Sequence, residues 1–186
     1  SSRVVILGGG PGGYEAALVA AQLGADVTIV ERDGIGGAAV LTDCVPSKAL
    51  IKTATLARQM RHAADYGLAP AQPGIDFAQV MDRVARVVRD IEPHDSVERY
   101  TQLGVDVVQG RARITSPWHV EITAEDGSKQ TLSTRSIVVA TGAAPFVPPL
   151  PGLDAVGYLT SDTLWGLREL PKRLVVLGGG PIGCEL

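Results

Sequence analysis

The feature that most constrains this chain is a segment of 13 residues that occurs twice. RVVILGGGPGGYE, over 3–15, and RLVVLGGGPIGCE, over 173–185, align without gaps at an offset of 170 residues. Each copy joins a short, apolar, β-branched run to a cluster of glycines, a pattern typical of a buried parallel strand that ends in a tight turn. The repeat therefore predicts two strand–turn–helix units, one near each end of the chain.

The first copy begins a complete βαβ unit of about 30 residues. A strand over 3–7 is followed by a segment of helical composition, YEAALVAAQLG, and then by a second strand, DVTIVE, over 26–31. Gly24 lies where that helix would end, and glycine is common just after a helix. These features predict an α/β fold built on a parallel sheet.

The glycines of the first copy have the spacing of a dinucleotide-binding turn. Gly8, Gly10 and Gly13 form G-x-G-x-x-G, and Glu31 follows 23 residues after Gly8. The first glycine permits a tight turn, the second lets backbone N–H groups approach a diphosphate, and the third lets the helix pack closely on the sheet. The helix N-terminus offers N–H donors to the phosphates, and Glu31 offers a carboxylate to a ribose 2′-OH.

The second copy repeats this spacing at Gly178, Gly180 and Gly183, but the residue that would separate NAD from NADP lies beyond the end of the chain. A strand with a few helical residues does not complete a domain, so we expect a fragment of a longer protein. The proline-rich segment APFVPPLPG marks a boundary. We predict a dinucleotide-binding domain over 1–148, then a linker and the truncated start of a second such domain over 149–186.

Three further helices are predicted between the glycine turns. One runs over 46–64, with its proline in the first turn, where a missing N–H costs nothing. A second runs from about residue 76 to 103, with a kink at Pro93. A short one lies in TSDTLWGLREL, with Ser161 or Asp162 as its cap.

Strands are predicted in DVVQGRARI, WHVEITAEDGSKQTLS and RSIVVATG, with Asp126-Gly127 as a hairpin turn. The expected fold class is therefore a Rossmann-like α/β domain with parallel sheet, helices and an inserted β-meander or hairpin. The start of a second Rossmann-like domain follows it.

Composition and charge exclude several other classes of protein. The net charge of −3 argues against a nucleic-acid or anionic-membrane partner, and no run of 18 apolar residues could span a membrane. The two cysteines, Cys44 and Cys184, are too far apart for a metal-ligand spacing and do not suggest a disulfide scaffold. No metal site is predicted, and the expected compartment is the cytoplasm.

A motif between the two glycine turns contains candidate catalytic residues. Residues 34–48 read GIGGAAVLTDCVPSK, which contains GG-x6-C-x-P-S-K, and ATG at 140–142 precedes the linker. With the two glycine turns, these motifs resemble the flavoprotein disulfide reductases, the pyridine-nucleotide oxidoreductase family of glutathione reductase and dihydrolipoamide dehydrogenase. The resemblance covers essentially the whole chain. It implies FAD in the first site, NAD or NADP in the second, and a homodimer formed through a C-terminal domain that is absent here.

The resemblance also implies a role for individual positions. Lys48 matches a lysine beside flavin N5, and Glu185 matches the glutamate that pairs with it. The cofactor-binding positions that it implies are Gly8, Gly10, Pro11, Gly12, Gly13, Glu31 and Arg32 for the ADP half of FAD; Gly36, Gly37, Ala38 and Ala39 beside the diphosphate and ribityl chain; Gly110 and Ala112 near the adenine; Thr141 and Gly142 under the flavin domain; and Gly178, Gly180, Pro181, Ile182 and Gly183 for the nicotinamide nucleotide.

The motif departs from the family in one respect. The family's usual pattern is GG-x-C-x4-C-x-P-S-K, whereas this chain has Ala39 at the first cysteine position and keeps only the second, Cys44; Asp43 stands where the family usually has glycine. In the family, the first cysteine attacks the disulfide substrate. Its loss removes the nucleophile of thiol–disulfide exchange, unless another thiol substitutes for it.

The leading hypothesis is therefore an FAD-dependent NAD(P)H oxidoreductase whose flavin passes electrons directly to a small acceptor, a quinone. GGAAVLxDCVPSK resembles most closely the NAD(P)H:quinone reductase branch, sometimes described as lipoamide-dehydrogenase-like. Cys44, Lys48 and Glu185 are the candidate catalytic residues.

Two alternatives stay open. In the first, Cys44 acts alone in a peroxidase or disulfide reductase, or the protein is lipoamide-dehydrogenase-like; in the second, the chain is a non-catalytic FAD-binding module. Cys44 could equally serve only to pack against the flavin. Packing or surface roles are expected for the remaining cysteine and for the three histidines, Cys184, His62, His94 and His119.

Overall fold

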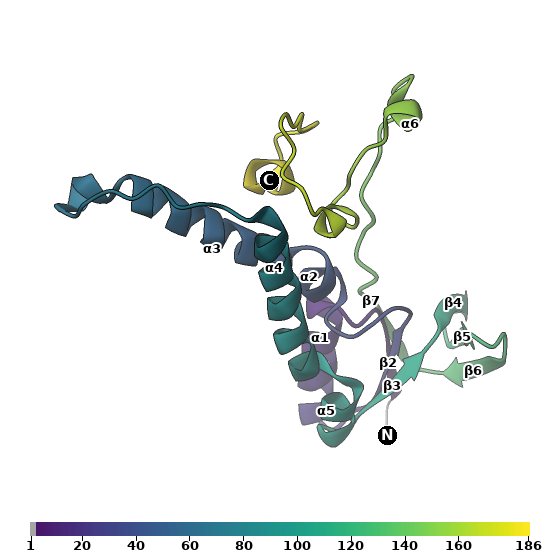
Figure 1. The fold of residues 1–186 in the computed structure, drawn as a ribbon. Coiled ribbons are helices and arrows are strands. Elements are labelled where there is room, and N and C mark those ends of the chain that lie inside the picture. The colour runs from purple at the N-terminus through teal and green to yellow at the C-terminus, as the bar shows by residue number, and fades with distance from the viewer. Residues whose placement is uncertain (1–2) are drawn as a thin grey trace. The chain divides into compact units, whose positions relative to one another are not determined.

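The computed structural model describes residues 3–186, without the side chains of His94 and Asp95, so the expectation for His94 lies outside the described side chains. Figure 1 draws its helices and strands, coloured from purple at the N-terminus to yellow at the C-terminus. The chain divides into two compact units. One comprises Ser1–Ala39 and Ile91–Ala144, and the other comprises Val40–Asp90 and Pro145–Leu186.

The first unit contains a parallel sheet of four strands in the order β3-β2-β1-β7. These strands are β1 (Arg3–Leu7), β2 (Asp26–Glu31), β3 (Val105–Gln109) and β7 (Ser136–Val139). Helix α1 (Pro11–Gln22) connects β1 to β2, and the two strands pair in parallel along all of β1, from Arg3 opposite Asp26 to Leu7 opposite Val30. The predicted βαβ unit is confirmed, with both strands at the predicted residues.

The two faces of this sheet are covered by different elements. Ile6 and Ile29 face a buried cluster with Ala17 of α1 and Tyr100 of α5 (Val97–Gln102). On the opposite face, Val5 lies in a second buried cluster, which also contains Leu7, Val30, Val120 and Ile122. Because side chains alternate along a strand, the continuous apolar runs of β1 and β2 supply both clusters.

The second buried cluster joins the parallel sheet to an antiparallel one. The antiparallel strands are β4 (Arg111–Ser116), β5 (His119–Thr123) and β6 (Lys129–Ser133), in sequential order. The β5–β6 turn contains Gly127 at φ 82°, as the Asp126-Gly127 signal predicts. The predicted inserted meander is therefore confirmed.

One strand prediction needs correction. DVVQGRARI was predicted as a continuous strand, but the chain breaks at Gly110, so that β3 joins the parallel sheet and β4 the antiparallel one. Gly110 has φ 155°, and a Cβ there would lie 2.8 Å from the carbonyl oxygen of Thr123. Only glycine allows the two sheets to approach so closely at this point.

The helices between the glycine turns follow the predictions with shifted ends. Helix α3 spans Cys44–Arg61 and is followed by the 3₁₀ turn η1 (Ala63–Tyr66), so Cys44 lies in the first turn rather than before it. The predicted kink at Pro93 is a break, because a 3₁₀ turn, η2 (Glu92–Asp95), separates α4 (Phe77–Ile91) from α5. The short helix α2 (Gly37–Leu41) was not predicted.

Two predictions in the C-terminal part are wrong. The run over 173–177 forms no strand within the described part of the chain, and Val175 is 81% exposed. An apolar run becomes a strand only where a neighbouring strand pairs with it. The predicted helix near Ser161 is reduced to one 3₁₀ turn, η3 (Leu164–Gly166), which begins after Thr163.

Two other short segments complete the description. Helix α6 spans Leu153–Val156, after the extended proline-rich segment, and α7 spans Pro181–Glu185. In the described range, 3–186, no helix is both long and apolar enough to cross a membrane.

Gly13 holds α1 close to the end of β1. A Cβ on Gly13 would overlap the backbone carbonyl oxygen of Gly8, whereas a Cβ on Gly12 would meet no described atom within 4 Å. Gly13 is therefore packed against the backbone of Gly8, whereas Gly12 has room for a side chain.

We expect Gly13→Ala to lower the free energy of unfolding by about 1–3 kcal/mol, because overpacking against backbone forces the turn to shift. Gly12→Ala is the matched control, and it should be neutral or stabilising by up to about 1 kcal/mol through helix propensity. Urea unfolding followed by circular dichroism measures both. Equal stabilities of the two variants would contradict the close approach of Gly13 to Gly8.

Candidate functional site

The first glycine turn leaves the N-terminus of α1 open. Gly8 has φ 103° and donates its N–H to the carbonyl of Val30 at 2.8 Å, which sets the turn at the end of the sheet. Gly10 is the N-cap residue, none of the described side chains caps this 12-residue helix, and its first turn holds no acidic residue. A Cβ on Gly10 would meet no described atom within 4 Å. The positive end of α1 is thus bare backbone, which fits a diphosphate.

The GG pair of the central motif lies against this turn. Gly36 donates its N–H to the carbonyl of Gly9 at 2.8 Å, and a Cβ on Gly37 would lie 3.0 Å from Cα of Gly10. Both residues have positive φ, at 95° and 56°. Two glycine segments far apart in sequence are therefore packed backbone to backbone. Ala38, which follows in α2, is exposed.

Glu31 binds the backbone of the same turn. Its Oε2 accepts from the N–H of Gly9 at 2.5 Å, and its Oε1 accepts from the N–H groups of Arg32 and Asp33, each at 2.7 Å. A carboxylate has about four acceptor positions, and these three bonds leave one for a ribose hydroxyl. The bonds to the backbone had no signal in the sequence, where only spacing marked Glu31.

Arg32 is directed elsewhere. Its Nη2 and Nε lie 2.6 Å and 2.9 Å from Oδ2 of Asp33. The hydrogen bond from Arg32 lowers the pKa of the Asp33 carboxyl. The predicted contact of Arg32 with the ADP half of FAD stays a prediction.

The remaining predicted residues of the first site lie at the carboxyl ends of neighbouring parallel strands. Gly110 follows β3 and donates its N–H to the carbonyl of Glu31 at 2.8 Å, and a Cβ on Gly8 would overlap the carbonyl oxygen of Ala140, just before Thr141 and Gly142. In open α/β sheets this edge is where ligands bind. Ala112 differs, because it packs against the second buried cluster.

The second glycine turn has the backbone geometry of the first. Gly180 has φ −76° and ψ 179°, against −74° and −177° at Gly10. Gly178 has φ 121°, and a Cβ on Gly183 would overlap its carbonyl oxygen. Pro181 begins the helix, as Pro11 does, and the next residue is Ile182, which is exposed. The repeat in the sequence is thus a repeat in local conformation at the glycine turn, but not over the apolar run that precedes it.

Lys48 of α3 forms an ion pair with Glu185 of α7. Nζ lies 2.6 Å from each carboxylate oxygen, and the side chains are 57% and 32% exposed. The hydrogen bond to Glu185 raises the pKa of Lys48, and the same bond lowers the pKa of Glu185. The structure therefore brings together the two residues that the resemblance pairs; their catalytic role stays a prediction.

Cys44 is four residues before Lys48 on the same helix, so the two side chains share a face of α3. Its thiol is exposed. Among the described residues, both cysteines are free, and the thiol of Cys184 donates to the carbonyl of Gly179 at 3.4 Å. The position five residues before Cys44 is Ala39, so that α2 carries no thiol.

The loop before Cys44 is bound by the linker segment. Trp165 of η3 donates its indole N–H to the carbonyl of Thr42 at 2.8 Å. The hydroxyl of Thr42 lies 3.3 Å from Oδ1 of Asp162. Neither contact had a signal in the sequence, because the residues are more than 100 positions apart.

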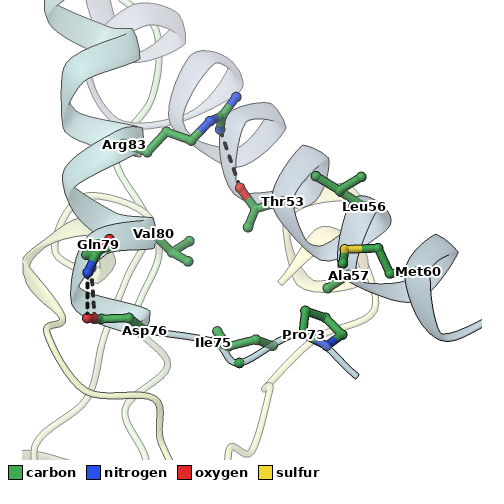
Figure 2. A pocket seen from close by; sticks show the side chains of 11 residues that line it. Thr53, Leu56, Ala57, Met60, Pro73, Ile75, Asp76, Gln79, Val80 and Arg83 are labelled. Carbon is green, nitrogen blue, oxygen red and sulfur yellow. Dashed lines mark hydrogen bonds between the residues drawn. The ribbon is translucent and has the colours of Figure 1, made fainter. Parts of the chain in front are cut away.

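A groove of about 310 Å³ lies between α3 and α4 (Figure 2). Its floor is apolar, with Leu56 and Met60 among its lining residues. Arg83 points toward α3, where its Nη1 lies 2.8 Å from the carbonyl of Ala49 and 3.4 Å from the hydroxyl of Thr53. None of the predicted site residues lines this groove, so it is distinct from the predicted cofactor site.

Comparison with known proteins identifies the family. The family model described as pyridine nucleotide-disulphide oxidoreductase matches residues 2–186. The chain belongs to the pyridine nucleotide-disulphide oxidoreductase family. This family binds FAD and depends on NAD(P), so the predicted cofactors are confirmed at the level of the family.

The curated relatives of this oxidoreductase chain have different names. It is 38% identical to a dihydrolipoyl dehydrogenase of Chlorobaculum parvum and 38% identical to an NAD(P)H dehydrogenase (quinone) of Mycobacterium tuberculosis, over 98% and 99% of this chain. A mercuric reductase of Streptomyces lividans is 34% identical over 98% of the chain. In all three matches, the chain spans 39% of the relative's length.

Solved structures agree with the fold. LpdA from M. tuberculosis matches with a TM-score of 0.78 and 38% identity, covering 92% of this chain and 38% of that one. The HOCl-induced flavoprotein disulfide reductase RclA from Escherichia coli matches with a TM-score of 0.80 and 27% identity, covering 98% and 38%. The predicted α/β fold class and family are therefore confirmed.

The ion pair predicts how Glu185 titrates. Its lowered pKa means that the pair contributes stability above the ordinary pKa of a glutamate, about 4.3, and that this contribution is lost as the pH falls through the lower, folded value. The raised pKa of Lys48 means that the contribution is lost again only as the pH rises through a value above about 10.4.

We expect Lys48→Met to raise the pKa of Glu185 toward its ordinary value, measured by ¹³C NMR of the side-chain carboxyl. Asp126 accepts from Ser128 and is remote from Lys48 in sequence, so its pKa should stay low in both proteins and serves as the internal control. A Glu185 titration unchanged by Lys48→Met would refute the ion pair.

The contact of Trp165 with Thr42 predicts a difference between the two tryptophans. Trp165→Phe removes the donor to the Thr42 carbonyl and should lower the free energy of unfolding by about 0.5–1.5 kcal/mol, measured by urea unfolding. Trp118→Phe changes an exposed side chain and should have no measurable effect. Indistinguishable unfolding curves for the two variants would show that the indole N–H makes no net contribution.

Proposed function

We propose that the whole protein is an FAD-dependent NAD(P)H oxidoreductase that delivers electrons to a small acceptor, a quinone, without a redox disulfide. The single observation that supports it is the composition of the motif around α2 and α3. Ala39 replaces one thiol, and Cys44 is the only sulfur left in the motif. Because thiol–disulfide exchange by a dithiol needs two cysteines, this motif by itself cannot carry it.

The flavin, when bound, supplies a ring that accepts a hydride from NAD(P)H and gives up its electrons to an oxidant. The chain's own residues would bind and orient it. The bare N-terminus of α1 would bind the diphosphate, the remaining acceptor position on Glu31 would bind a ribose hydroxyl, and Gly36 and Gly37 would leave room beside the diphosphate. By the family resemblance, Lys48 would place a positive charge near the ring, where reduction adds negative charge.

Charge balance explains why Lys48 needs Glu185 in this proposal. A lysine brought out of water next to an apolar ring is costly unless a carboxylate pairs with it. The Nζ–Oε distances of 2.6 Å provide that partner. Ala38 and Ala39 add little side-chain volume, which would leave space for a planar acceptor that a pair of cysteines would restrict.

We expect Cys44→Ser in the whole protein to retain quinone reduction within about threefold, since no step of the proposed reaction uses the thiol. The test measures NAD(P)H oxidation with a water-soluble quinone, after a visible spectrum has established that flavin is bound. Efficient lipoamide turnover by the unchanged protein, or a colourless protein that takes up no flavin, would overturn the proposal.

Ala39→Cys provides the complementary variant. It restores the spacing C-x4-C with Cys44 and should add disulfide reductase activity that the unchanged protein lacks. A variant with flavin bound but with unaltered substrate preference would argue that Ala39 does not determine the acceptor.

A second candidate activity follows from the exposure of Cys44 in the first turn of an 18-residue helix. A thiolate there would attack a peroxide, forming a sulfenic acid and releasing the other oxygen as water or alcohol. Two electrons, which a flavin reduced by NAD(P)H would supply, and two protons would convert the sulfenic acid back to the thiol and release water. Cys44→Ser would abolish this peroxidase turnover, so the same variant separates the two activities.

The larger assembly is also a proposal. We propose residues 1–148 as the FAD-binding domain and residues 149–186 as the linker and start of the NAD(P)-binding domain. The family resemblance implies a homodimer, and the composition of the chain favours the cytoplasm as its compartment. The two free cysteines agree with a reducing compartment.

A further inference from the structure

Ser47 is a buried polar residue beside the Lys48–Glu185 pair. It lies at the end of the first turn of α3, is 4% exposed, and belongs to the P-S-K part of the motif, where no role follows from the resemblance. Its hydroxyl oxygen lies 3.2 Å from Oε2 of Glu185, 3.3 Å from the carbonyl of Cys44 and 3.4 Å from Nζ of Lys48. One short side chain thus contacts both members of the ion pair.

The hydroxyl has one proton and two acceptors within reach. A hydrogen bond to an ionised carboxylate is shorter and stronger than one to a neutral carbonyl. With Glu185 ionised, the hydroxyl of Ser47 therefore donates to Oε2 rather than to the Cys44 carbonyl. Its lone pairs then face the ammonium group of Lys48, which donates to it.

The ion pair alone does not define its own geometry. Lys48 and Glu185 have long side chains, and both are partly exposed, so water competes for each group and rotamer entropy opposes a single arrangement. Ser47 has one side-chain torsion and is buried in a helix, so its hydroxyl group has few alternative positions. It also binds across two elements, α3 and α7.

We propose that Ser47 is the positioning residue of this site: its hydroxyl holds the carboxylate of Glu185 so that both oxygens face Lys48. The effect of Ser47 on catalysis rests on the proposed function, in which the position of the Lys48 charge near the flavin matters. Ser47 would then control that position through Glu185. The contact itself does not depend on which acceptor the enzyme uses.

The test compares Ser47→Ala with the unchanged protein, using the whole protein with ¹³C-labelled glutamate. We expect the pKa of Glu185 to rise, in the same direction as in Lys48→Met but by less, because one of its two hydrogen-bonding side chains is lost. The other groups that act on this cluster, Cys44 and Asp43, are unchanged in the variant. The kcat for quinone reduction should fall roughly threefold to tenfold, with the KM for the quinone unchanged.

Thr53→Ala is the matched control. It removes another hydroxyl of α3, which donates to the carbonyl of Ala49 and accepts from Arg83, and it should leave the pKa of Glu185 unaltered. If Ser47→Ala does not fold, Ser47→Cys keeps nearly the same volume with a weaker donor and should shift the pKa in the same direction.

The results separate the positioning role of Ser47 from the proposed quinone reductase activity. A pKa shift without any quinone reductase activity in the unchanged protein would refute the proposed function and keep the positioning role. An unaltered pKa of Glu185 in a folded Ser47 variant would overturn the positioning role, whatever the activity.

Discussion

The site depends on a contact between backbone atoms that only glycine permits. Gly13 lies against the carbonyl oxygen of Gly8, and Gly8 in turn lies against the carbonyl oxygen of Ala140, so the start of α1, the end of β1 and the end of β7 meet without intervening side chains. This contact places the N-terminus of α1, which none of the described side chains caps, at the carboxyl edge of the sheet. Glu31 and Gly36 then bind the same turn through Gly9, one through a carboxylate and one through a backbone N–H.

The chemistry of the second unit is set by charge and by the number of thiols. Cys44, Ser47 and Lys48 lie within five consecutive residues of α3, and Glu185 reaches them from α7. The arrangement offers a paired ammonium group, a buried hydroxyl and one exposed thiol. Such a set suits the stabilisation of negative charge more than the exchange of a disulfide. The family names alone do not make this distinction, because relatives at equal identity are named for lipoyl and for quinone substrates.

The parts of the fold that could be predicted are those whose local sequence pattern by itself indicates the secondary structure. Strands β1 and β2 are buried on both faces, so their apolar runs carry the signal at every position, and the glycine spacing marks the turn between β1 and α1. The run over 173–177 has the same composition but no pairing strand among the described residues, so it stays extended and exposed. Gly110 could not be recognised from the sequence as the point where β3 ends and β4 begins. The need for glycine there comes from the backbone of β5, which lies against it only in the folded chain.

The same distinction holds for the site. The pairing of Lys48 with Glu185 was available only through resemblance to a family, since 137 residues separate them. The contacts of Ser47 and Trp165 had no signal at all, because a serine in a helix and a tryptophan in a linker are compatible with many surroundings. Hydrogen bonds across the chain depend on tertiary structure, and a single sequence without aligned relatives contains little information about it.

The likeness of the two glycine turns has a consequence for how such a turn forms. Gly180 has φ −76° and ψ 179°, against −74° and −177° at Gly10, although the structure describes no strand over 173–177 before it. The glycine and proline residues therefore favour this backbone shape by themselves, and pairing of the preceding run in a sheet is not required for it.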